Sequence, residues 1–517
     1  MSAQRRRRWR IWQPLPVWAA LLVGAASGAL LTTAFQPLGW WPMALLATAG
    51  ELWAIRGQKR RWALLIGLVT GIAFWLIHIE WITVYLGPVP LLALGGFMAL
   101  WRGVGAVAIA AAYRHLERWL PRSTHGFLIP IGVAAIMVAR ETASATWPWG
   151  GFSWGRLGFS QGGTIMGDAV SWTSVSGLSF LLAVLSAMLL QLLVQRHGEV
   201  RRRVTIVAAA LIGAVAIPAY PVAHDDTVRV GAVQGASEAG LLAEYERGDI
   251  MRQHHEASRM LEGEYDLVVL PENAGEWNPH LDPRSQMIMD EISMRTGAPL
   301  VIGGITGDAE EYFNSALVWE PGLGDTAIYH KRHPVPFAEY LPQRELFEPI
   351  LDALGFLHLI PRDYAVDDTS ANAFDFDTFS AGVAICFDII DDRLMREMVV
   401  DHGATIILAP TNNADFGYGS SENIQQLAIA QVRAEELGRS VVNISTVGTS
   451  AMVLSDGSMV ERLPQYEPGV MSYDLPTSTT LTPAARFGGI IDWAVPLLGF
   501  GLLGAAIVRN RSDRKAQ

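Results

Sequence analysis

The sequence of 517 residues contains a single cysteine, Cys386. One thiol excludes a disulfide within the chain and excludes the multi-cysteine sets of structural zinc sites. Cys386 ends the apolar run Phe379 to Ile385 and is followed by Phe387 and Asp388. A free cysteine is usually a small buried hydrophobe, whereas one at the end of a strand that turns into a helix is typical of a nucleophile. Position alone leaves both interpretations open.

Lysine is nearly as scarce, with copies only at Lys59, Lys331 and Lys515. Between residues 224 and 486 Lys331 is the only lysine, beside fifteen arginines. A lone lysine among arginines suggests a task for a compact point charge. A chain that prefers arginine throughout would give the same pattern, so both explanations stay open at this point.

The sequence also lacks a His-Glu-x-x-His motif and a phosphate-binding glycine loop. Two pairs of histidines, His254 with His255 and His330 with His333, could suggest a metal site. No cysteine or clustered acid completes a zinc set with either pair. We therefore predict no metal ligand and no cofactor, and we assign these histidines surface or supporting roles.

Charge is unevenly distributed along the chain. Residues 224–486 carry 42 acidic and 16 basic side chains, whereas the rest of the chain carries 8 acidic and 23 basic ones. This partition predicts an acidic, water-soluble domain set into a basic, apolar remainder. We expect no nucleic-acid partner.

The remainder is typical of an integral membrane protein. Eight apolar stretches reach or approach the roughly 20 residues that a helix needs to cross a bilayer. They cover residues 17–35, 38–55, 63–86, 89–112, 126–145, 169–194, 204–221 and 488–508. A secretion signal shares the basic and then apolar pattern of the N-terminus, but seven further spans favour a retained helix.

The basic connectors predict the orientation of these spans. Residues 5–8, 56–61, 114–122, 196–203 and 509–515 fall on one side of an eight-span arrangement, which the positive-inside rule makes cytoplasmic. The prediction is an N-terminal membrane domain of about seven helices (1–223), an extracytoplasmic domain (224–486), and a last transmembrane helix with a basic cytoplasmic tail (487–517).

Residues 224–486 alternate short β-branched runs with amphipathic stretches, which predicts an α/β layered domain. The predicted strands are 228–234, 267–270, 300–302, 315–318, 380–385, 405–408 and 440–444. The predicted helices are 242–263, 284–297, 391–402 and 420–438.

Three candidate catalytic residues follow predicted strands. Glu272 follows residues 267–270, Lys331 follows residues 326–330, and Cys386 ends its own strand. A carboxylate can accept a thiol proton, a thiolate can attack a carbonyl, and an ammonium can stabilise the resulting oxyanion.

These residues carry a resemblance to a known family. Residues 270–272, 331–342 and 385–388 resemble the Glu-Lys-Cys signatures of the nitrilase (carbon-nitrogen hydrolase) superfamily. The eight-span arrangement, the run 35–42 after the first span and the run 233–235 at the start of the acidic domain are similar to the apolipoprotein N-acyltransferase family. The resemblance covers nearly the whole chain.

The resemblance implies a nitrilase-like αββα sandwich beside a polytopic α-helical membrane bundle, in the bacterial inner membrane. Glu272 would deprotonate Cys386, which would take an acyl chain from a membrane phospholipid and pass it to the α-amino group of a diacylglyceryl-lipoprotein. Lys331 would stabilise both tetrahedral intermediates. Glu339, Phe387 and Asp388 would have supporting roles beside the three catalytic residues.

Two other function classes stay in view. A membrane-tethered amidase or nitrilase would use water as acceptor with the same three residues, and a non-catalytic scaffold would anchor a polyprenol-phosphate glycosyltransferase. The complete triad argues against the scaffold. The eight spans argue against a hydrolase of soluble amides, which would have no need of them.

Ionisable residues in the apolar stretches are costly and often functional. His78 and Glu80 fall in the third stretch, and Arg140 and Glu141 near the outer end of the fifth. Arg140 could meet a lipid phosphate, pair with Glu141 within the bundle, or extend its charged end to the interface, and the sequence leaves these alternatives open.

A further apolar segment, residues 347–360, is too short to cross a bilayer. It would suit a core helix. Our hypothesis is that it is a lid or an arm that dips into the outer leaflet, because a catalytic domain must meet substrates with acyl chains at that interface.

Overall fold

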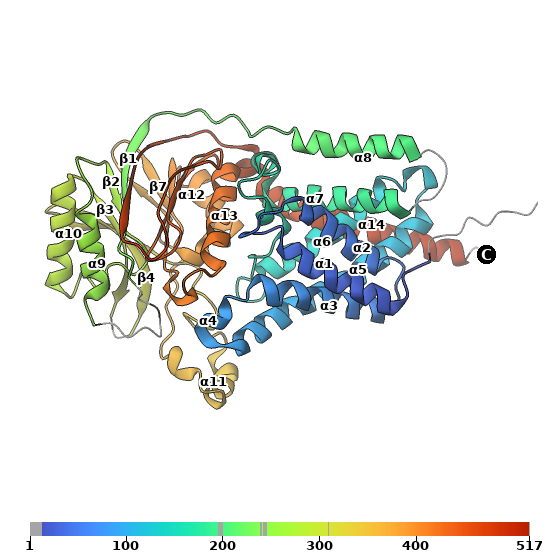
Figure 1. Ribbon diagram of the computed structural model, residues 1–517, viewed down its shortest axis with the longest axis horizontal. Coiled ribbons are helices and arrows are strands. Elements are labelled where there is room, and N and C mark those ends of the chain that lie inside the picture. The colour runs from blue at the N-terminus through green and yellow to red at the C-terminus, as the bar shows by residue number, and fades with distance from the viewer. Residues whose placement is uncertain (1–12, 195–199, 238–239, 241–245, 309, 516–517) are drawn as a thin grey trace, which may run out of the picture.

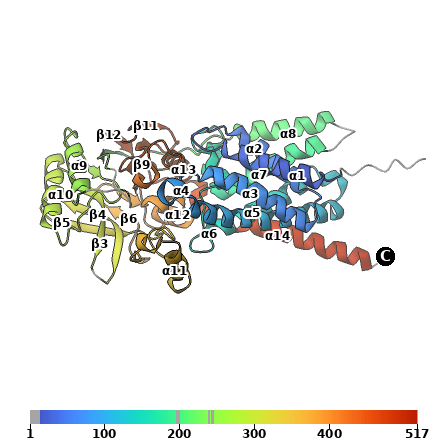
Figure 2. The ribbon, with the colours of Figure 1, turned by 60° about the horizontal axis from the view of Figure 1, so that its bottom comes forward.

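The computed structural model describes residues 13–194, 200–237, 240, 246–308 and 310–515. Figure 1 shows an elongated molecule with a bundle of helices at one end and a two-sheet α/β unit at the other. In the turned view of Figure 2, α14 lies along one edge of the bundle and α8 along the other. The basic residues 5–8 lie outside the described residues.

Each predicted apolar stretch overlaps a helix of at least 14 residues. In order these are α1 (Val17–Thr32), α2 (Pro42–Ile55), α3 (Arg60–His78), α5 (Pro88–Trp119), α6 (Leu128–Thr146), α7 (Val170–Val194), α8 (Val200–Val215) and α14 (Pro483–Lys515). Within the described chain, α3, α5, α6, α7 and α14 are long and apolar enough to cross a bilayer, and α1 and α2 are shorter apolar helices. The chain is therefore a membrane protein.

The third predicted stretch, 63–86, is wrong as a single span. Helix α3 ends at His78, and a separate five-residue helix, α4 (Ile82–Leu86), follows after a turn. Glu80 lies in that turn with its side chain exposed, because a carboxylate is more stable in water than against apolar neighbours. His78 is the last residue of α3, and Glu80 lies outside it.

The α/β unit contains two six-stranded sheets. The first has the order β12-β1-β2-β3-β4-β5 and the second β11-β10-β9-β8-β7-β6. The first sheet comprises β1 (Thr227–Gln234), β2 (Leu267–Val269), β3 (Leu300–Gly307), β4 (Tyr312–Glu320), β5 (Gly324–His330) and β12 (Gly469–Pro476). The second comprises β6 (Ala373–Asp375), β7 (Ser380–Val383), β8 (Ile406–Thr411), β9 (Ser440–Ser445), β10 (Ala451–Val453) and β11 (Met459–Arg462).

Apolar side chains of both sheets fill the space between them. Val230 and Val301 of the first sheet share one buried cluster with Val383 and Leu408 of the second. Helices α9 (Asp249–Ser258) and α10 (Pro283–Thr296) cover the outer face of the first sheet. Helices α12 (Asp392–Val400) and α13 (Glu422–Leu437) cover the second. The layers are thus αββα, and the predicted fold class is confirmed.

Helix α13 also joins the α/β unit to the bundle. Its residues Leu427 and Ile429 belong to one buried apolar cluster together with Leu178 of α7. Figure 1 shows α13 at the boundary between the two parts. The second sheet therefore lies nearer the membrane helices than the first.

All seven predicted strands are present, and α10, α12 and α13 begin and end within a few residues of their predicted bounds. The predicted helix 242–263 is shorter, since α9 covers Asp249–Ser258; residues 242–245 lie outside the described chain. Strands β6 and β10 have three residues each, too few for an alternating pattern to be visible. Helix α11 (Arg344–Ala353) begins before the apolar segment 347–360 and ends within it.

Candidate active site

Glu272 lies just beyond the carboxyl end of β2, a parallel strand in the first sheet. Its Oε1 accepts hydrogen bonds from Asn314 Nδ2 at 2.6 Å and Lys331 Nζ at 3.0 Å, and its Oε2 accepts one from the Asn412 amide at 2.8 Å. Gly303 passes so close that a Cβ there would lie 2.5 Å from the Glu272 Cα. The carboxylate is thus buried and fixed by three donors.

Lys331 follows β5 and is 1% exposed. Its ammonium lies 3.0 Å from Glu272 Oε1 and 2.9 Å from Glu339 Oε1. Burial lowers the pKa of Lys331, but the carboxylates of Glu272 and Glu339 outweigh burial and hold that pKa well above its usual value. The lysine is therefore a permanently charged ammonium. Glu339 also accepts from Asn314 Nδ2 at 3.0 Å.

Cys386 follows β7 (Ser380–Val383) by three residues and begins the 3-10 turn Cys386–Ile390. Its φ is +50°, the left-handed region that residues with a Cβ seldom occupy. Strain of this kind is often found where a nucleophile must project from a strand end. The side chain is half-buried.

Four groups and burial influence the thiol. Burial raises the pKa of Cys386, the Glu272 carboxylate raises it further, the Lys331 ammonium and a hydrogen bond with Thr411 lower it, and Glu422 adds a smaller rise. The net pKa is above the ordinary range of a cysteine, so the resting group is a thiol. A reaction at this sulfur needs a base, and the Glu272 carboxylate interacts with it directly enough to shift its pKa.

Asp388 is fully buried and ties the nucleophile turn to the strand that carries Lys331. Its Oδ2 accepts from the Tyr329 hydroxyl at 2.9 Å and from the Ile385 amide at 3.2 Å, and its Oδ1 accepts from the His333 amide at 2.9 Å. Burial raises the pKa of Asp388, which the hydrogen bonds and nearby cations oppose.

Phe387 faces the membrane half. Its ring stacks on Phe152, with centroids 6.1 Å apart and an interplanar angle of 17°. Phe152 belongs to the loop after α6, and its ring lies 5.7 Å from that of Trp75 in α3. The residue next to the nucleophile therefore contacts the bundle.

The structure brings Glu272, Lys331, Glu339, Cys386 and Asp388 together, whereas the ring of Phe387 faces the bundle. It also adds polar residues that the sequence did not reveal. Asn314 is the clearest, because it holds both Glu272 and Glu339 from the middle of β4. Its only signal is a polar residue within a β-branched run. In the described part of the chain no group of three or more His, Cys, Asp or Glu side chains could hold a metal ion.

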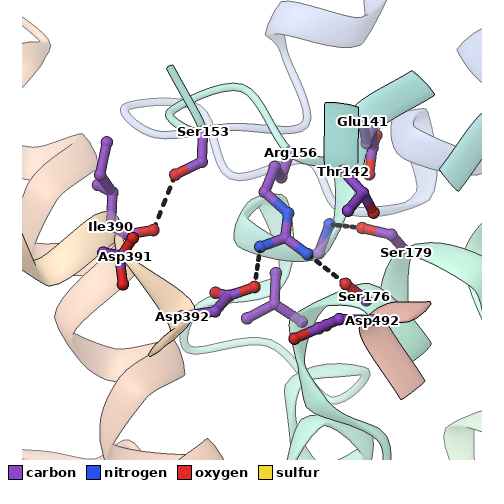
Figure 3. A network of polar contacts seen from close by, with 12 residues as sticks. Glu141, Thr142, Ser153, Arg156, Ser176, Ser179, Ile390, Asp391, Asp392 and Asp492 are labelled. Carbon is purple, nitrogen blue, oxygen red and sulfur yellow. Dashed lines mark hydrogen bonds and ion pairs between the residues drawn. The ribbon is translucent and has the colours of Figure 1, made fainter. Parts of the chain in front are cut away.

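A polar network links the loop after α6 to the catalytic half (Figure 3). Arg156 binds Asp392 at the start of α12 and donates to Ser176 Oγ at 2.7 Å. Asp392 also accepts from Arg433 Nη2 at 2.8 Å, and Ser153 Oγ donates to the Ile390 carbonyl at 2.8 Å. These contacts fix the second sheet against the membrane helices.

The predicted ionisable pair of the fifth stretch belongs to a buried cluster. Arg102 binds Glu51 through two hydrogen bonds of 3.1 and 2.9 Å, and Arg140 lies 3.4 Å from Glu51 and 3.8 Å from Glu141. These side chains are largely buried and paired among themselves. Pairing within the bundle is thus what the structure favours for Arg140. A cavity of about 20 Å³ beside them has room for one water.

Two family models match the chain. The model described as apolipoprotein N-acyltransferase N-terminal domain matches residues 27–188, and the model described as carbon-nitrogen hydrolase matches residues 229–483. The first match lies on the helical bundle and the second on the α/β unit.

Proteins named apolipoprotein N-acyltransferase are similar along nearly the whole chain. The protein from Mycolicibacterium smegmatis is 29% identical over 95% of this chain and 86% of its own. The proteins from Haemophilus ducreyi and Azotobacter vinelandii are 24% and 27% identical, over 96% and 98% of this chain and 98% of their own lengths. Among solved structures, an amidase from Nesterenkonia sp. AN1 is 15% identical with a TM-score of 0.36, over 48% of this chain and 93% of the amidase.

Proposed function

Because the chain belongs to the apolipoprotein N-acyltransferase family, within the carbon-nitrogen hydrolase superfamily, we propose that it transfers an acyl chain from a membrane phospholipid to the α-amino group of a lipoprotein's N-terminal diacylglyceryl-cysteine. One observation carries the proposal. Glu272, Lys331 and Cys386 meet in an α/β unit that adjoins helices long and apolar enough to cross a bilayer.

The first half-reaction forms a thioester. Glu272 takes the thiol proton while the Cys386 sulfur attacks the ester carbonyl carbon of the phospholipid. When the tetrahedral intermediate collapses, the C–O bond breaks and the lysophospholipid oxygen leaves with the proton from Glu272. The raised pKa of Cys386 supports a step in which base and attack act together rather than a resting thiolate.

The second half-reaction forms the amide. The lipoprotein amine attacks the thioester carbonyl carbon, Glu272 accepts a proton from the nitrogen, the C–S bond breaks and the sulfur regains a proton. Lys331 suits both oxyanions, because its ammonium has three N–H donors and Glu272 and Glu339 occupy two. Asp388 and Phe387 would hold the turn that presents the sulfur.

We further propose the arrangement in the membrane. Residues 1–223 and 487–517 would be the membrane parts of a multi-pass protein in the bacterial inner membrane, and residues 224–486 the catalytic domain on its extracytoplasmic face. The basic connectors support this orientation.

The test is transfer of a labelled acyl chain in detergent micelles, with phospholipid as donor and a diacylglyceryl lipopeptide as acceptor. With donor alone, intact mass spectrometry should show one acyl mass on the protein, removable by neutral hydroxylamine. Cys386→Ala should lack the adduct, and Cys386→Ser should turn over poorly because an alcohol is a weak nucleophile at neutral pH. Free fatty acid formed equally fast with and without the lipopeptide would instead favour the water-using hydrolase.

A further inference from the structure

A buried chain of hydrogen bonds runs from Glu422 to the backbone of the nucleophile. The Asn413 Nδ2 donates to Glu422 Oε2 at 2.7 Å and to Gln426 Oε1 at 2.8 Å. The Gln426 Nε2 in turn donates to the carbonyl oxygen of Cys386 at 3.3 Å. Glu422 and Gln426 lie in the first turns of α13, and Asn413 follows β8.

The partners of these amides determine which way each one points. Gln426 Oε1 accepts from Thr411 Oγ1 at 3.2 Å as well as from Asn413, so its nitrogen is left to face Cys386. Asn413 Oδ1 accepts from Ser445 Oγ at 2.6 Å, so its nitrogen faces Glu422. An acceptor at Glu422 therefore fixes both amides in turn.

The hydrogen-bond chain ends at Cys386, whose backbone conformation is strained. Cys386 adopts a φ of +50°, which a residue with a Cβ holds only when its surroundings enforce it. Its carbonyl is held by Gln426, and its side chain contacts Thr411, which also donates to Gln426. The hydrogen bonds that run from Glu422 through Asn413 and Gln426 are among the contacts that can hold this conformation.

The charge of Glu422 matters as well as its shape. The side chain is 2% exposed. Burial raises the pKa of Glu422 to about 8, the hydrogen bond from Asn413 opposes the rise, and the Glu272 and Asp415 carboxylates add to it. Glu422 is the first residue of α13, and a helix N-terminus favours an anion, but this effect is smaller than that of burial beside other acids.

We propose that Glu422 is a positioning residue for Cys386: its uncharged carboxyl holds Asn413 and Gln426 in the orientation that fixes the nucleophile's backbone, and its ionisation opposes negative charge on the sulfur. The groups that interact with it or with the thiol are Glu272 after β2, Asp415 after β8 and Lys331 after β5. The relevance to acyl transfer rests on the proposed function, whereas the effect on the thiol does not.

The uniqueness of Cys386 supplies a test that needs no substrate. Alkylation of the full-length protein by iodoacetamide, followed by intact mass, reports on this thiol alone. We would measure the rate from about pH 6.5 to about pH 9.5 for wild type and Glu422→Gln. Because glutamine keeps the acceptor but cannot ionise, the ratio of variant to wild-type rate should rise several-fold across this range.

Glu435→Gln is the matched control. Glu435 lies near the other end of α13, is also buried, and has a pKa raised by burial and by Asp168 and Asp456, but it contacts Gly167 and Gly457 instead of the site. The ratio of its alkylation rate to the wild-type rate should stay constant with pH. A rising ratio for Glu435→Gln, or a constant ratio for Glu422→Gln, would overturn the proposal.

Glu422→Leu tests the orienting role separately. Leucine removes both the acceptor and the charge, whereas glutamine removes only the charge, so alkylation of Cys386 should be slower in Glu422→Leu than in Glu422→Gln at every pH. Equal rates for the two variants at low pH would refute an orienting role. Loss of acyl transfer with these alkylation profiles intact would count against the proposed function and not against this inference.

Discussion

The backbone N–H of Asn412 donates a 2.8 Å hydrogen bond to Oε2 of Glu272, across 140 positions of sequence. Asn412 follows β8 in the second sheet, and Glu272 follows β2 in the first. The proposed base is therefore held from both sheets at once. Its position depends on how the two sheets pack, and neither strand alone could fix it.

Glu272→Gln should abolish turnover while leaving the fold nearly intact. The glutamine oxygen can still accept from Lys331 and Asn314, but its nitrogen meets the Asn412 N–H donor to donor and cannot take a proton. Loss of a general base costs about 10²- to 10⁴-fold in rate. Thermal unfolding and acyl transfer should be measured on the same preparation; a rate within tenfold of wild type, about 1.4 kcal/mol, would contradict the assignment.

Lys331→Arg should fail despite keeping the charge. The planar guanidinium cannot donate to Glu272 and Glu339 and also leave one N–H aimed at an oxyanion in the space of a compact ammonium. Loss of one oxyanion donor costs on the order of a hundredfold or more in kcat. The measurement is single-turnover thioester formation.

Lys331→Met is the companion variant. It removes the charge and leaves Glu272 and Glu339 buried without their cation, so a loss of stability should accompany the loss of rate. If Lys331→Met formed the thioester at a near-normal rate, the lysine would be structural only.

The link between the membrane helices and the catalytic half should be measurable as stability. Arg156→Met removes one of the cations around the buried Asp392, which keeps its hydrogen bond from Arg433, and removal of one partner from a buried ion pair costs about 3–5 kcal/mol. The control is Arg229→Met, because Arg229 is 45% exposed where it pairs with Asp474 and such pairs contribute about 0–1 kcal/mol. Thermal unfolding in detergent should separate the two; equal shifts would refute a structural role for Arg156.

The sequence predicted the strands and the candidate residues better than the contacts between them. Glu272, Lys331 and Cys386 could be proposed as site residues because each residue type is rare or conspicuous at a strand end. Asn314, Asn413 and Gln426 could not, since their value lies in contacts between residues far apart in the chain, and an amide within a strand or helix carries no local signal. The turn after His78 was missed for a related reason: the stretch 63–86 is apolar on average, and the exposed carboxylate of Glu80 ends the span.

Exposed apolar side chains on α11 identify a surface with which the segment that we predict to enter the outer leaflet could contact lipid. Helix α11 and the residue after it expose Leu346 (61%), Ile350 (50%) and Leu354 (50%). Figure 1 shows α11 projecting from the side of the molecule, near the boundary with the bundle. The ring of Phe347, also in α11, lies 5.7 Å from the ring of Trp149 in the loop after α6. An exposed apolar row tied to the membrane half is the arrangement expected of a segment that lies in a lipid surface.

Replacing Leu346, Ile350 and Leu354 together with serine should therefore lower turnover of long-chain phospholipid and spare that of a short, soluble ester. Each large apolar side chain contributes about 1.5–3 kcal/mol when it leaves water, so the loss on vesicle-bound substrate should exceed tenfold. Met287→Ser with Met294→Ser is the control, because these exposed side chains lie on α10, at the end of the molecule away from the bundle. An equal loss on both substrates would mean that α11 supports the site itself, and the arm would then be part of the fold and not a contact with lipid.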